Sequence, residues 1–292
     1  MKPVSNYNIA VLLTCYNRKA KTLSFLESLF NQDYFRQLNA DIYLVDDAST
    51  DGTGAAVKEN YPTVNVVAGT GSLFWAGGMR MVWRHAMAIK EYDIFLMFND
   101  DVILLDDAVE RLMTQYDQLD KKGAIIVGST MGIESKKLTY GGNIHPDIKR
   151  RKYFRADPDD EKPLVCHSCN ANILLVDKLT VEKTGIFPDR YVHCLADFDY
   201  TITAFKSGIN VLIAPGYYGY CEDDHGANWL PGNNSLKKRI KYLYSPTGLA
   251  YKEYLYFIKK HFPADYLVSF TKLWLKTFFP VLWERFKLKE DH

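Results

Sequence analysis

The sequence predicts an α/β fold, in which helices cover both faces of a buried sheet. Two observations carry this prediction: short apolar runs alternate with segments of helical periodicity, and the run at residues 95–98 is apolar throughout. Continuous apolar runs are typical of strands that are buried on both faces. The chain then continues with Asn99, Asp100 and Asp101. Since α/β sheets bind ligands at the carboxyl ends of their strands, these three residues mark the expected site.

Strands and helices are expected to alternate through the first third of the chain. Each expected strand is a short apolar run between turn residues, and each expected helix has apolar residues three or four positions apart. In chain order these elements are strand 9–14, helix 21–31, strand 42–45, a helix after the turn 48–52, strand 64–67, helix 77–89 and strand 94–98. Ser49 or Asp51 is the expected cap after the turn, because its side-chain oxygen can accept a hydrogen bond from the first helical amides.

The same alternation continues further along the chain, with one interruption. A helix is expected over 105–119, where Asp106 and Asp107 suit the positive end of a helix dipole. The remaining expected elements are strands 124–127, 173–176 and 211–214 and helices 179–184 and 200–207. Residues 131–163 contain a glycine pair, three prolines and a basic run at 149–152, so a loop or insertion is expected there.

Composition and charge narrow the class of protein. The chain has 292 residues, of which 47% are hydrophobic and 24% charged, as in an ordinary soluble globular protein with one large or two small α/β domains. A formal net charge of +1 argues against a globally basic nucleic-acid binder, so no nucleic-acid partner is expected. The first apolar run, residues 9–13, is too short for a signal peptide or a membrane span.

The chain has five cysteines, an odd number without a repeating spacing, which favours reduced thiols in the cytoplasm. Cys166 and Cys169 form a Cys-x-x-Cys pair, and His193 and Cys194 follow. A zinc site is one interpretation of these residues. The spacing matches no common zinc module, so ordinary buried cysteines are the preferred interpretation.

Residues 231–292 form a basic, aromatic-rich block, expected to be a helical extension of the main domain. Lysine, tyrosine and tryptophan at helical spacing suit an anionic membrane surface. They equally suit helices that pack on the main domain and keep a solvated basic face, and both interpretations stay open. Segment 266–283 is interrupted by Lys272, Lys276 and Pro280, so it is not expected to span a bilayer.

Asp100 and Asp101 are the strongest functional signal from the residues themselves. Two adjacent carboxylates repel each other unless a positive group lies between them and a partner. A divalent metal is the simplest such group, and a metal beside a sheet of this kind most commonly holds a diphosphate. The sequence therefore indicates an enzyme that handles nucleotides.

Five motifs, in one order along the chain, resemble those of glycosyltransferase family 2, whose members are inverting enzymes with the GT-A fold. They are residues 13–18, 45–53, 71–80, 99–101 and 185–200. The third is similar to the variant found in rhamnosyltransferase-like members. The resemblance covers residues 8–226 and implies a GT-A, Rossmann-like mixed sheet flanked by helices, in a domain over residues 1–230.

The resemblance also implies a catalytic centre built from acidic residues. Asp197 would be the general base that takes the proton from the acceptor hydroxyl. Asp101 and His225 would hold a divalent metal, Mn²⁺ or Mg²⁺, at the diphosphate of the donor. Two positions depart from the family pattern: Asn99 stands first in the Asp-x-Asp motif, and Ala196 precedes the base where a glutamate is usual.

The donor, a UDP- or dTDP-linked sugar, is expected to bind along the same edge of the sheet. The residues assigned to it are Thr14, Tyr16, Arg18, Asp46, Trp75, Gly77, Gly78, Arg80, Asn99 and Asp100. Asp46 would accept the imide N–H of the base, and the backbone of Gly77 and Gly78 would approach phosphate at a helix start. The simpler alternatives are a helix-capping Asp46, a surface Arg18 and a plain helix start.

The implied activity is inverting transfer of a hexosyl or deoxyhexosyl group to a hydroxyl of a glycan or lipid-linked glycan, as in surface polysaccharide synthesis. A cytoplasmic enzyme, peripheral at the inner face of the cell membrane, fits the basic, aromatic tail. Two other classes stay open: a non-catalytic nucleotide-sugar-binding scaffold and a sugar nucleotidyltransferase. The second would need a glycine-rich phosphate loop after the first strand, and residues 14–18 contain no glycine.

Overall fold

The computed structural model describes residues 6–119, 123–223 and 234–281. At its centre lies a ten-stranded mixed sheet. Its strands are β1 (Ile9–Cys15), β2 (Ala40–Asp46), β3 (Val64–Ala68), β4 (Ile94–Phe98), β5 (Ile103–Leu104), β6 (Ala124–Met131), β7 (Leu138–Tyr140), β10 (Leu164–Val165), β12 (Ile173–Asp177) and β13 (Asn210–Tyr220). Their order is β10-β13-β6-β12-β4-β1-β2-β3, with β5 beside β13 and β7 beside β6.

Strand direction brings the predicted site residues to one edge of this sheet. β1, β2, β3 and β4 run parallel, whereas β12 is antiparallel to both β4 and β6. Every residue of β1 and of β4 is buried, which explains their continuous apolar runs. Because β1, β2 and β4 are parallel, their carboxyl ends at Cys15, Asp46 and Phe98 meet at the same edge.

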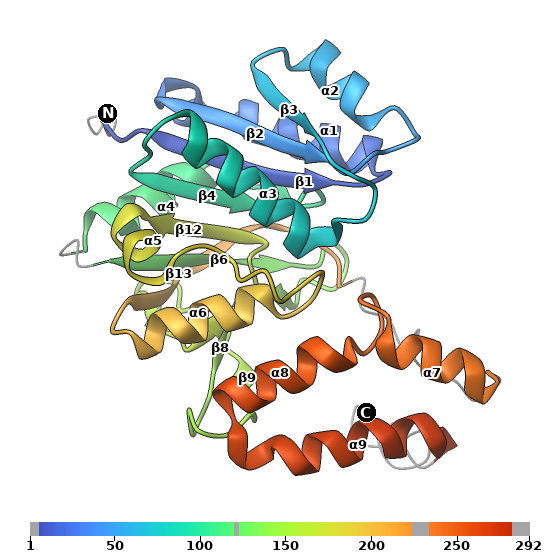
Figure 1. The fold of residues 1–292 in the computed structure, drawn as a ribbon. Coiled ribbons are helices and arrows are strands. Elements are labelled where there is room, and N and C mark those ends of the chain that lie inside the picture. Colours follow the sequence, from blue (N-terminus) through green and yellow to red (C-terminus); the bar gives the residue numbers. More distant parts are fainter. Residues whose placement is uncertain (1–5, 120–122, 224–233, 282–292) are drawn as a thin grey trace.

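Helices cover both faces of the sheet, as Figure 1 shows. They are α1 (Lys19–Phe30), α2 (Thr53–Asn60), α3 (Phe74–Ile89), α4 (Ala108–Asp117), α5 (Lys178–Thr184), α6 (Ala196–Lys206), α7 (Leu236–Tyr244), α8 (Tyr251–His261) and α9 (Tyr266–Phe278), with short 3-10 turns η1 (Phe35–Gln37) and η2 (Pro263–Asp265). One apolar cluster joins α3 and α6 to the sheet, and a second joins α1, α2 and α4 to its other face. The predicted α/β fold is therefore confirmed.

Each strand and helix expected from the sequence is present, and the strand Ile94–Phe98 has the expected ends. The N-cap position of α2 belongs to Gly52, whose φ of 79° is left-handed, so neither Ser49 nor Asp51 occupies it. Asp51, one of the two expected caps, nevertheless accepts a hydrogen bond from the amide of Thr53, the first residue of α2, at 3.0 Å. Helix α3 begins at Phe74, earlier than the expected residue 77.

Residues 131–163, expected to be a loop or insertion, contain three short strands: β7, β8 (Gly142–Ile144) and β9 (Phe154–Arg155). β8 lies between β9 and β11 (Ser168–Cys169) in a small second sheet. The basic run 149–152 connects β8 to β9 and reaches the C-terminal extension, where Arg150 Nη2 lies 2.8 Å from Asp265 Oδ1. Part of the expected insertion is thus ordinary sheet structure.

The five cysteines are free, and the described residues contain no metal-binding cluster of His, Cys, Asp or Glu.

The C-terminal extension packs on the main domain through α8. Asp199 of α6 is buried, and its carboxylate lies 2.8 Å from Lys260 Nζ and 2.6 Å from His261 Nε2, both at the end of α8. The Tyr191 hydroxyl donates to the same carboxylate at 3.0 Å. Burial alone would raise the pKa of Asp199, but the hydrogen bonds and charges of His261 and Lys260 outweigh burial and lower it. We call Asp199, Tyr191, Lys260 and His261 the α6–α8 clamp.

Candidate active site

An acidic cluster lies where β4 ends. The Arg18 Nη1 atom lies 3.2 Å from Asp100 Oδ1 and 2.6 Å from Asp101 Oδ2. Lys21 Nζ lies 3.7 Å from Asp101 Oδ2, and the Thr22 hydroxyl donates to Asp100 Oδ2 at 3.0 Å. Residues before and within the first turn of α1 therefore supply the positive charge that two adjacent carboxylates require.

The two carboxylates of this cluster differ in environment. Burial raises the pKa of Asp100 to about 6; Arg18 acts to lower this pKa and Asp101 to raise it further. The Asp100 side chain is 6% exposed and that of Asp101 is 11% exposed, whereas that of Arg18 is 41% exposed. The guanidinium therefore forms the solvent-facing side of the cluster, and a ligand that approaches from solvent would meet it.

Oxygen ligands suit a divalent ion, and Asp101 is the carboxylate predicted to bind one, but Arg18 already binds this carboxylate. Asp101 Oδ2 is paired with Arg18, and Asp101 Oδ1 lies 3.7 Å from Cys221 Sγ. No group of three His, Cys, Asp or Glu side chains suits a metal within the described ranges, and His225 lies outside them. A metal at Asp101 would therefore compete with Arg18 for this carboxylate.

Asp197, the predicted base, is the second residue of α6. Its Oδ1 accepts a hydrogen bond from the Phe198 amide at 2.9 Å, and its Oδ2 accepts one from the Ala171 amide at 3.3 Å. Burial raises the pKa of Asp197 to about 6, although the Phe198 and Ala171 amides act to lower it. A carboxylate with this pKa is ionised near neutral pH and is basic enough to accept a proton.

Asp101 and Asp197 belong to the same edge of the sheet. The Asn99 amide donates to the Asn172 carbonyl at 3.0 Å, and the adjacent residue, Ala171, donates to Asp197. Cys221 Sγ lies 3.6 Å from Asn172 Nδ2 as well as 3.7 Å from Asp101 Oδ1. Short contacts through one backbone segment thus connect the acidic cluster to the predicted base.

Trp75 and Arg80, both on α3 and both predicted to contact the donor, make contacts within the protein. Trp75 Nε1 donates to Asn99 Oδ1 at 2.7 Å, and its ring centroid lies 5.6 Å from that of Phe187. Arg80 Nη1 donates to the carbonyl oxygens of Pro188 and Tyr191 at 2.9 and 3.0 Å. Arg80 therefore holds the segment that precedes α6, whereas Trp75 positions Asn99, whose amide oxygen can accept one more hydrogen bond.

Gly77, Gly78 and Thr14, all assigned to the donor, have packing contacts within the protein. Both glycines are buried inside α3, and the Gly77 amide donates to the Val192 carbonyl at 3.3 Å. A Cβ atom on Gly78 would lie 2.1 Å from Thr14 Oγ1. The absence of a side chain at Gly78 therefore lets α3 approach the end of β1, and Thr14, 9% exposed, lies beneath the helix.

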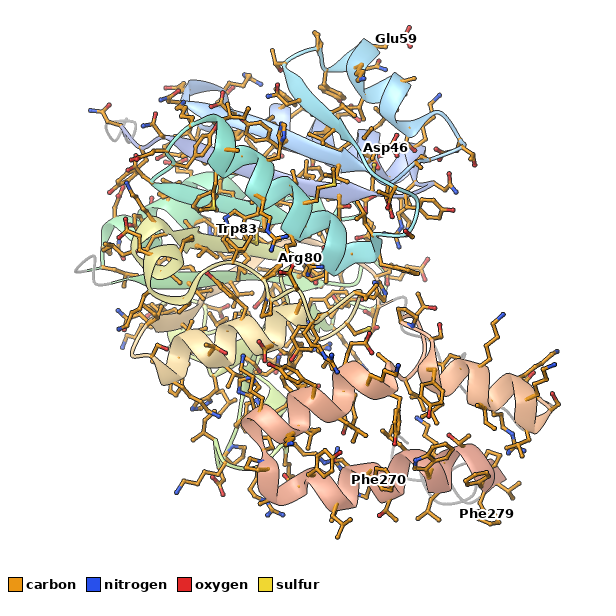
Figure 2. All side chains as sticks on the ribbon, in the orientation of Figure 1. Asp46, Glu59, Arg80, Trp83, Phe270 and Phe279 are labelled. Carbon is orange, nitrogen blue, oxygen red and sulfur yellow. The ribbon has the colours of Figure 1, made fainter. Side chains whose placement is uncertain are left out.

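Asp46, at the end of β2 (Figure 2), organises the loop that follows it. Its two carboxylate oxygens accept the amides of Ser49 and Gly54 at 2.9 and 3.0 Å. This is the simpler, structural alternative to nucleobase recognition. The neighbouring Asp47 is buried and accepts the amides of Gly71 and Leu73 at 2.6 and 2.8 Å, which fixes the entry to α3.

Left-handed backbone conformations concentrate around this edge. Non-glycine residues with positive φ include Asn17 (51°), Ala48 (58°), Phe74 (53°) and Leu195 (71°). They lie after β1, after β2, at the start of α3 and immediately before α6, four segments that contain or adjoin predicted site residues; the acidic cluster after β4 is a further one. Such conformations are costly for residues with a Cβ atom and cluster at functional sites.

Sequence reasoning does not identify three residues of this region: Lys21, Thr22 and Asp47. Thr22 lies four positions after Arg18, a spacing that places both on one helix face and offers a signal for it. Asp47 follows Asp46 directly, and only the fold shows that it binds the backbone before α3.

Tyr16 is 53% exposed and is therefore accessible to a ligand.

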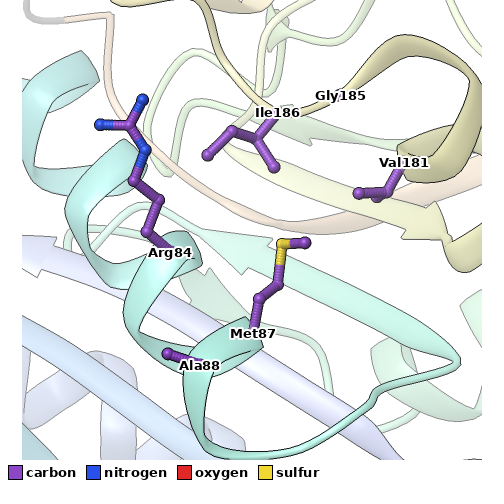
Figure 3. Close-up of a pocket in the computed structure, with 6 residues that line it drawn as sticks. All are labelled: Arg84, Met87, Ala88, Val181, Gly185 and Ile186. Carbon is purple, nitrogen blue, oxygen red and sulfur yellow. The ribbon is translucent and has the colours of Figure 1, made fainter.

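A pocket of about 390 Å³ lies elsewhere, between α3 and the α5 region (Figure 3). It is lined by Arg84, Met87, Ala88, Val181, Gly185 and Ile186. Its α3 residues come from the second half of that helix, whereas the predicted site residues lie in the first half. None of its lining residues carries a predicted role, so we do not assign donor binding to this pocket.

The mixed sheet, with acidic residues at the carboxyl ends of its parallel strands, defines an α/β protein whose ligand site is expected at that edge. A family model described as "Glycosyl transferase family 2" matches residues 10–179. The chain therefore belongs to glycosyl transferase family 2, as its motifs predict. No curated protein sequence matches the chain.

Solved structures show the same fold, that of GT-A glycosyltransferases. The mannosyltransferase PcManGT from Pyrobaculum calidifontis, in complex with GDP-Man and Mn²⁺, has 18% identity and a TM-score of 0.54 over 82% of this chain and 62% of that chain. TarS 1-349 from S. aureus in complex with UDP has 15% identity and a TM-score of 0.54 over 73% of this chain and 60% of that one. TarS 1-349 with UDP-GlcNAc also has 15% identity and a TM-score of 0.54. The match thus spans about six-tenths of each of these chains.

Proposed function

We propose that the protein is an inverting glycosyltransferase that moves a hexosyl or deoxyhexosyl group from a nucleotide diphosphate donor to an acceptor hydroxyl. One observation carries the proposal: Asp197, with a pKa raised to about 6, shares a sheet edge with the Asp100–Asp101 cluster. Family membership supports it. Structures of similar fold contain GDP-Man, UDP or UDP-GlcNAc, which supports a nucleotide-sugar donor.

In the proposed reaction, Asp197 accepts the proton of the acceptor hydroxyl while that oxygen attacks the anomeric carbon. The bond from the anomeric carbon to the diphosphate oxygen breaks on the opposite side, and its electron pair leaves with the nucleoside diphosphate. A single displacement of this kind inverts the anomeric configuration. Arg18 and Lys21 place positive charge beside Asp101. The negative charge of the leaving diphosphate would develop in the same region.

We propose that the donor, UDP- or dTDP-linked, lies against Tyr16, Asn99 and Asp100. Asp46 stays our candidate for the imide N–H, because each of its oxygens, which accept one backbone amide apiece, can accept another hydrogen bond. Asp101, with His225 as the proposed second ligand, would hold Mn²⁺ or Mg²⁺. When bound, such an ion neutralises charge on the diphosphate.

For the acceptor, we propose a glycan or lipid-linked glycan, in surface polysaccharide synthesis at the inner face of the cell membrane. The support for this class is the apolar and basic character of the C-terminal helices. Lys237, Lys238 and Lys241 of α7 are exposed. So are Leu267 and Val268 of α9, at 72% and 50%.

Thermal-shift measurements with a panel of UDP-, dTDP- and GDP-linked sugars in the presence of Mn²⁺ test donor binding, because a true donor stabilises the folded state. Release of nucleoside diphosphate from the same mixtures tests transfer or slow hydrolysis. We expect wild type to show both signals and Asp197→Asn to keep only the thermal shift. A thermal shift without release in wild type would favour a non-catalytic scaffold, and pyrophosphate formed from a nucleoside triphosphate and a sugar phosphate would favour a nucleotidyltransferase.

A further inference from the structure

Helix α9 differs from an ordinary helix of a globular protein because it exposes several large apolar side chains. The side chains that it buries are Ser269, Leu273 and Thr277. Those that it exposes are larger and mostly apolar: Leu267 (72% exposed), Val268 (50%), Phe270 (37%), Leu275 (38%) and Phe278 (45%). Helices of globular proteins normally direct their apolar stripe towards the core. The exposed stripe of α9 therefore calls for a partner outside the described part of this chain.

This stripe lies at the outer boundary of the molecule. Figure 1 shows α9 on the side of α8 that faces away from the sheet, and Figure 2 shows the labelled Phe270 and Phe279 at that end of the molecule. The inner side of α9 contacts α8, where Trp274 Nε1 donates to the Tyr251 hydroxyl at 3.2 Å. The α6–α8 clamp then joins α8 to the main domain. The apolar stripe thus belongs to a supported, docked helix.

Basic side chains flank the stripe. Helix α7 packs beside α9, and Arg239 Nη1 donates to the Phe278 carbonyl at 3.3 Å. The sequence of α7, LKKRIKYLY, contains four basic residues, and that of α9, YLVSFTKLWLKTF, contains two. Neither helix contains an acidic residue. We call the exposed side chains of these two helices the α7–α9 surface.

We propose that the α7–α9 surface docks on an anionic lipid bilayer, with α9 lying in the plane of the interface. Exposed apolar side chains flanked by lysine and arginine are typical of helices that insert shallowly between headgroups. Anionic lipids attract the four exposed lysines of this surface, Lys237, Lys238 and Lys241 on α7 and Lys272 on α9. None of the helices within the described ranges is long and apolar enough to cross a membrane, which agrees with a surface position.

Charge argues against a second copy of the chain as the partner. A symmetric dimer through this surface would place the basic residues of one copy against the same residues of the other. Like charges across an interface are unfavourable, and neither helix supplies an acidic residue to compensate. A bilayer that contains anionic lipid satisfies both the apolar and the electrostatic requirement.

Flotation with phosphatidylcholine vesicles, with and without phosphatidylglycerol, tests the proposal. We expect the full chain to float with the mixed vesicles and to remain largely unbound with phosphatidylcholine alone. Leu267→Glu with Val268→Glu should abolish flotation, because both side chains are exposed and their replacement leaves the core intact. The matched control is Ile89→Glu with Leu179→Glu, two exposed apolar residues on α3 and α5 that should leave flotation unchanged.

A second set of variants addresses charge. Lys237→Gln, Lys238→Gln and Lys241→Gln together should weaken partition into the mixed vesicles by about fivefold for each lysine removed. Equal binding to both vesicle types, or flotation of the Leu267→Glu/Val268→Glu variant as wild type, would overturn the proposal. The proposal would also be overturned if light scattering showed a concentration-dependent dimer that the Leu267→Glu/Val268→Glu variant abolishes. Nucleotide release is not part of this readout, so the result is separate from the proposed catalysis.

Discussion

At the scale of single residues, the position of Arg18 leads to a specific prediction about metal binding. Its Nη1 atom lies 2.6 Å from Oδ2 of Asp101, the carboxylate that would hold a divalent ion. Removing this charge should strengthen Mn²⁺ binding, because the ion then no longer competes with a cation. We expect Arg18→Gln to bind Mn²⁺ on the order of tenfold more tightly than wild type in an electron paramagnetic resonance titration.

Lys19→Gln is the matched control for Arg18→Gln. It removes a neighbouring positive charge from α1 that forms no ion pair with the acidic cluster, and Lys19 is exposed. We expect its Mn²⁺ affinity to stay close to that of wild type. An unchanged or weaker affinity in Arg18→Gln, with wild-type thermal stability, would show that Arg18 does not compete for Asp101.

The raised pKa of Asp197 sets the pH dependence of the proposed reaction. Burial raises this pKa to about 6, and only the ionised carboxylate can accept a proton. We therefore expect kcat/KM to fall about tenfold per pH unit below pH of about 6 and to level off above it. Asp197→Asn should lower kcat by roughly 10²–10⁴-fold and remove this acid limb.

Two comparisons make the Asp197 result specific. Asp107→Asn, on an exposed side chain before α4, should leave both the rate and the acid limb unchanged. Isothermal titration with the donor should give similar affinities for wild type and Asp197→Asn. An Asp197→Asn enzyme that retains substantial turnover would remove Asp197 from the role of base.

At the scale of elements, the close approach of α3 to β1 depends on Gly78. A Cβ atom there would lie 2.1 Å from Thr14 Oγ1, whereas one on Gly77 would lie 3.4 Å from its nearest neighbour, the Leu73 Cβ. We expect Gly78→Ala to destabilise the protein by about 1–3 kcal/mol through overpacking. Gly77→Ala should be neutral or stabilising by up to about 1 kcal/mol, because alanine favours the helix.

Urea denaturation of the two glycine variants measures this difference. Equal stabilities would mean that α3 can move away from β1 at no cost. Phosphate binding by this glycine pair stays a prediction from the sequence. Two glycines near a helix start resemble a phosphate loop, and only the packed structure shows that one amide is already bonded and that the other glycine faces Thr14.

At the scale of the whole molecule, the α6–α8 clamp joins the C-terminal helices to the main domain. Asp199→Asn weakens the hydrogen bonds that this buried carboxylate accepts from His261, which is buried, and from Lys260, whose side chain is 33% exposed; a loss of this kind costs about 1–3 kcal/mol. We expect a loss of that order in urea denaturation and faster proteolysis of the C-terminal helices. Lys259→Gln, on an exposed neighbouring side chain, is the control and should behave as wild type.

Acidification should weaken the same clamp. Burial lowers the pKa of His261, so protonation of this ring is easier in the unfolded chain, and stability is lost as pH falls below the ordinary histidine value of 6.5. The pKa of Asp199 is also lowered, so a further loss follows below its ordinary value of 3.8. Thermal melts across this pH range should show that His261→Gln loses less stability on acidification than wild type does. An equal loss of stability in wild type and His261→Gln would show that His261 does not cause it.

The sequence by itself determined the fold class, the order of strands and helices, the acidic edge and the family. These features depend on hydrophobic periodicity and motif spacing, which neighbouring residues encode. Tertiary structure decided which partner each polar side chain takes. Arg18 meets Asp100 across 82 positions and Asp199 meets His261 across 62. Such pairings, and the raised pKa values of Asp100 and Asp197, depend on burial and on distances in the folded chain, which no local pattern specifies.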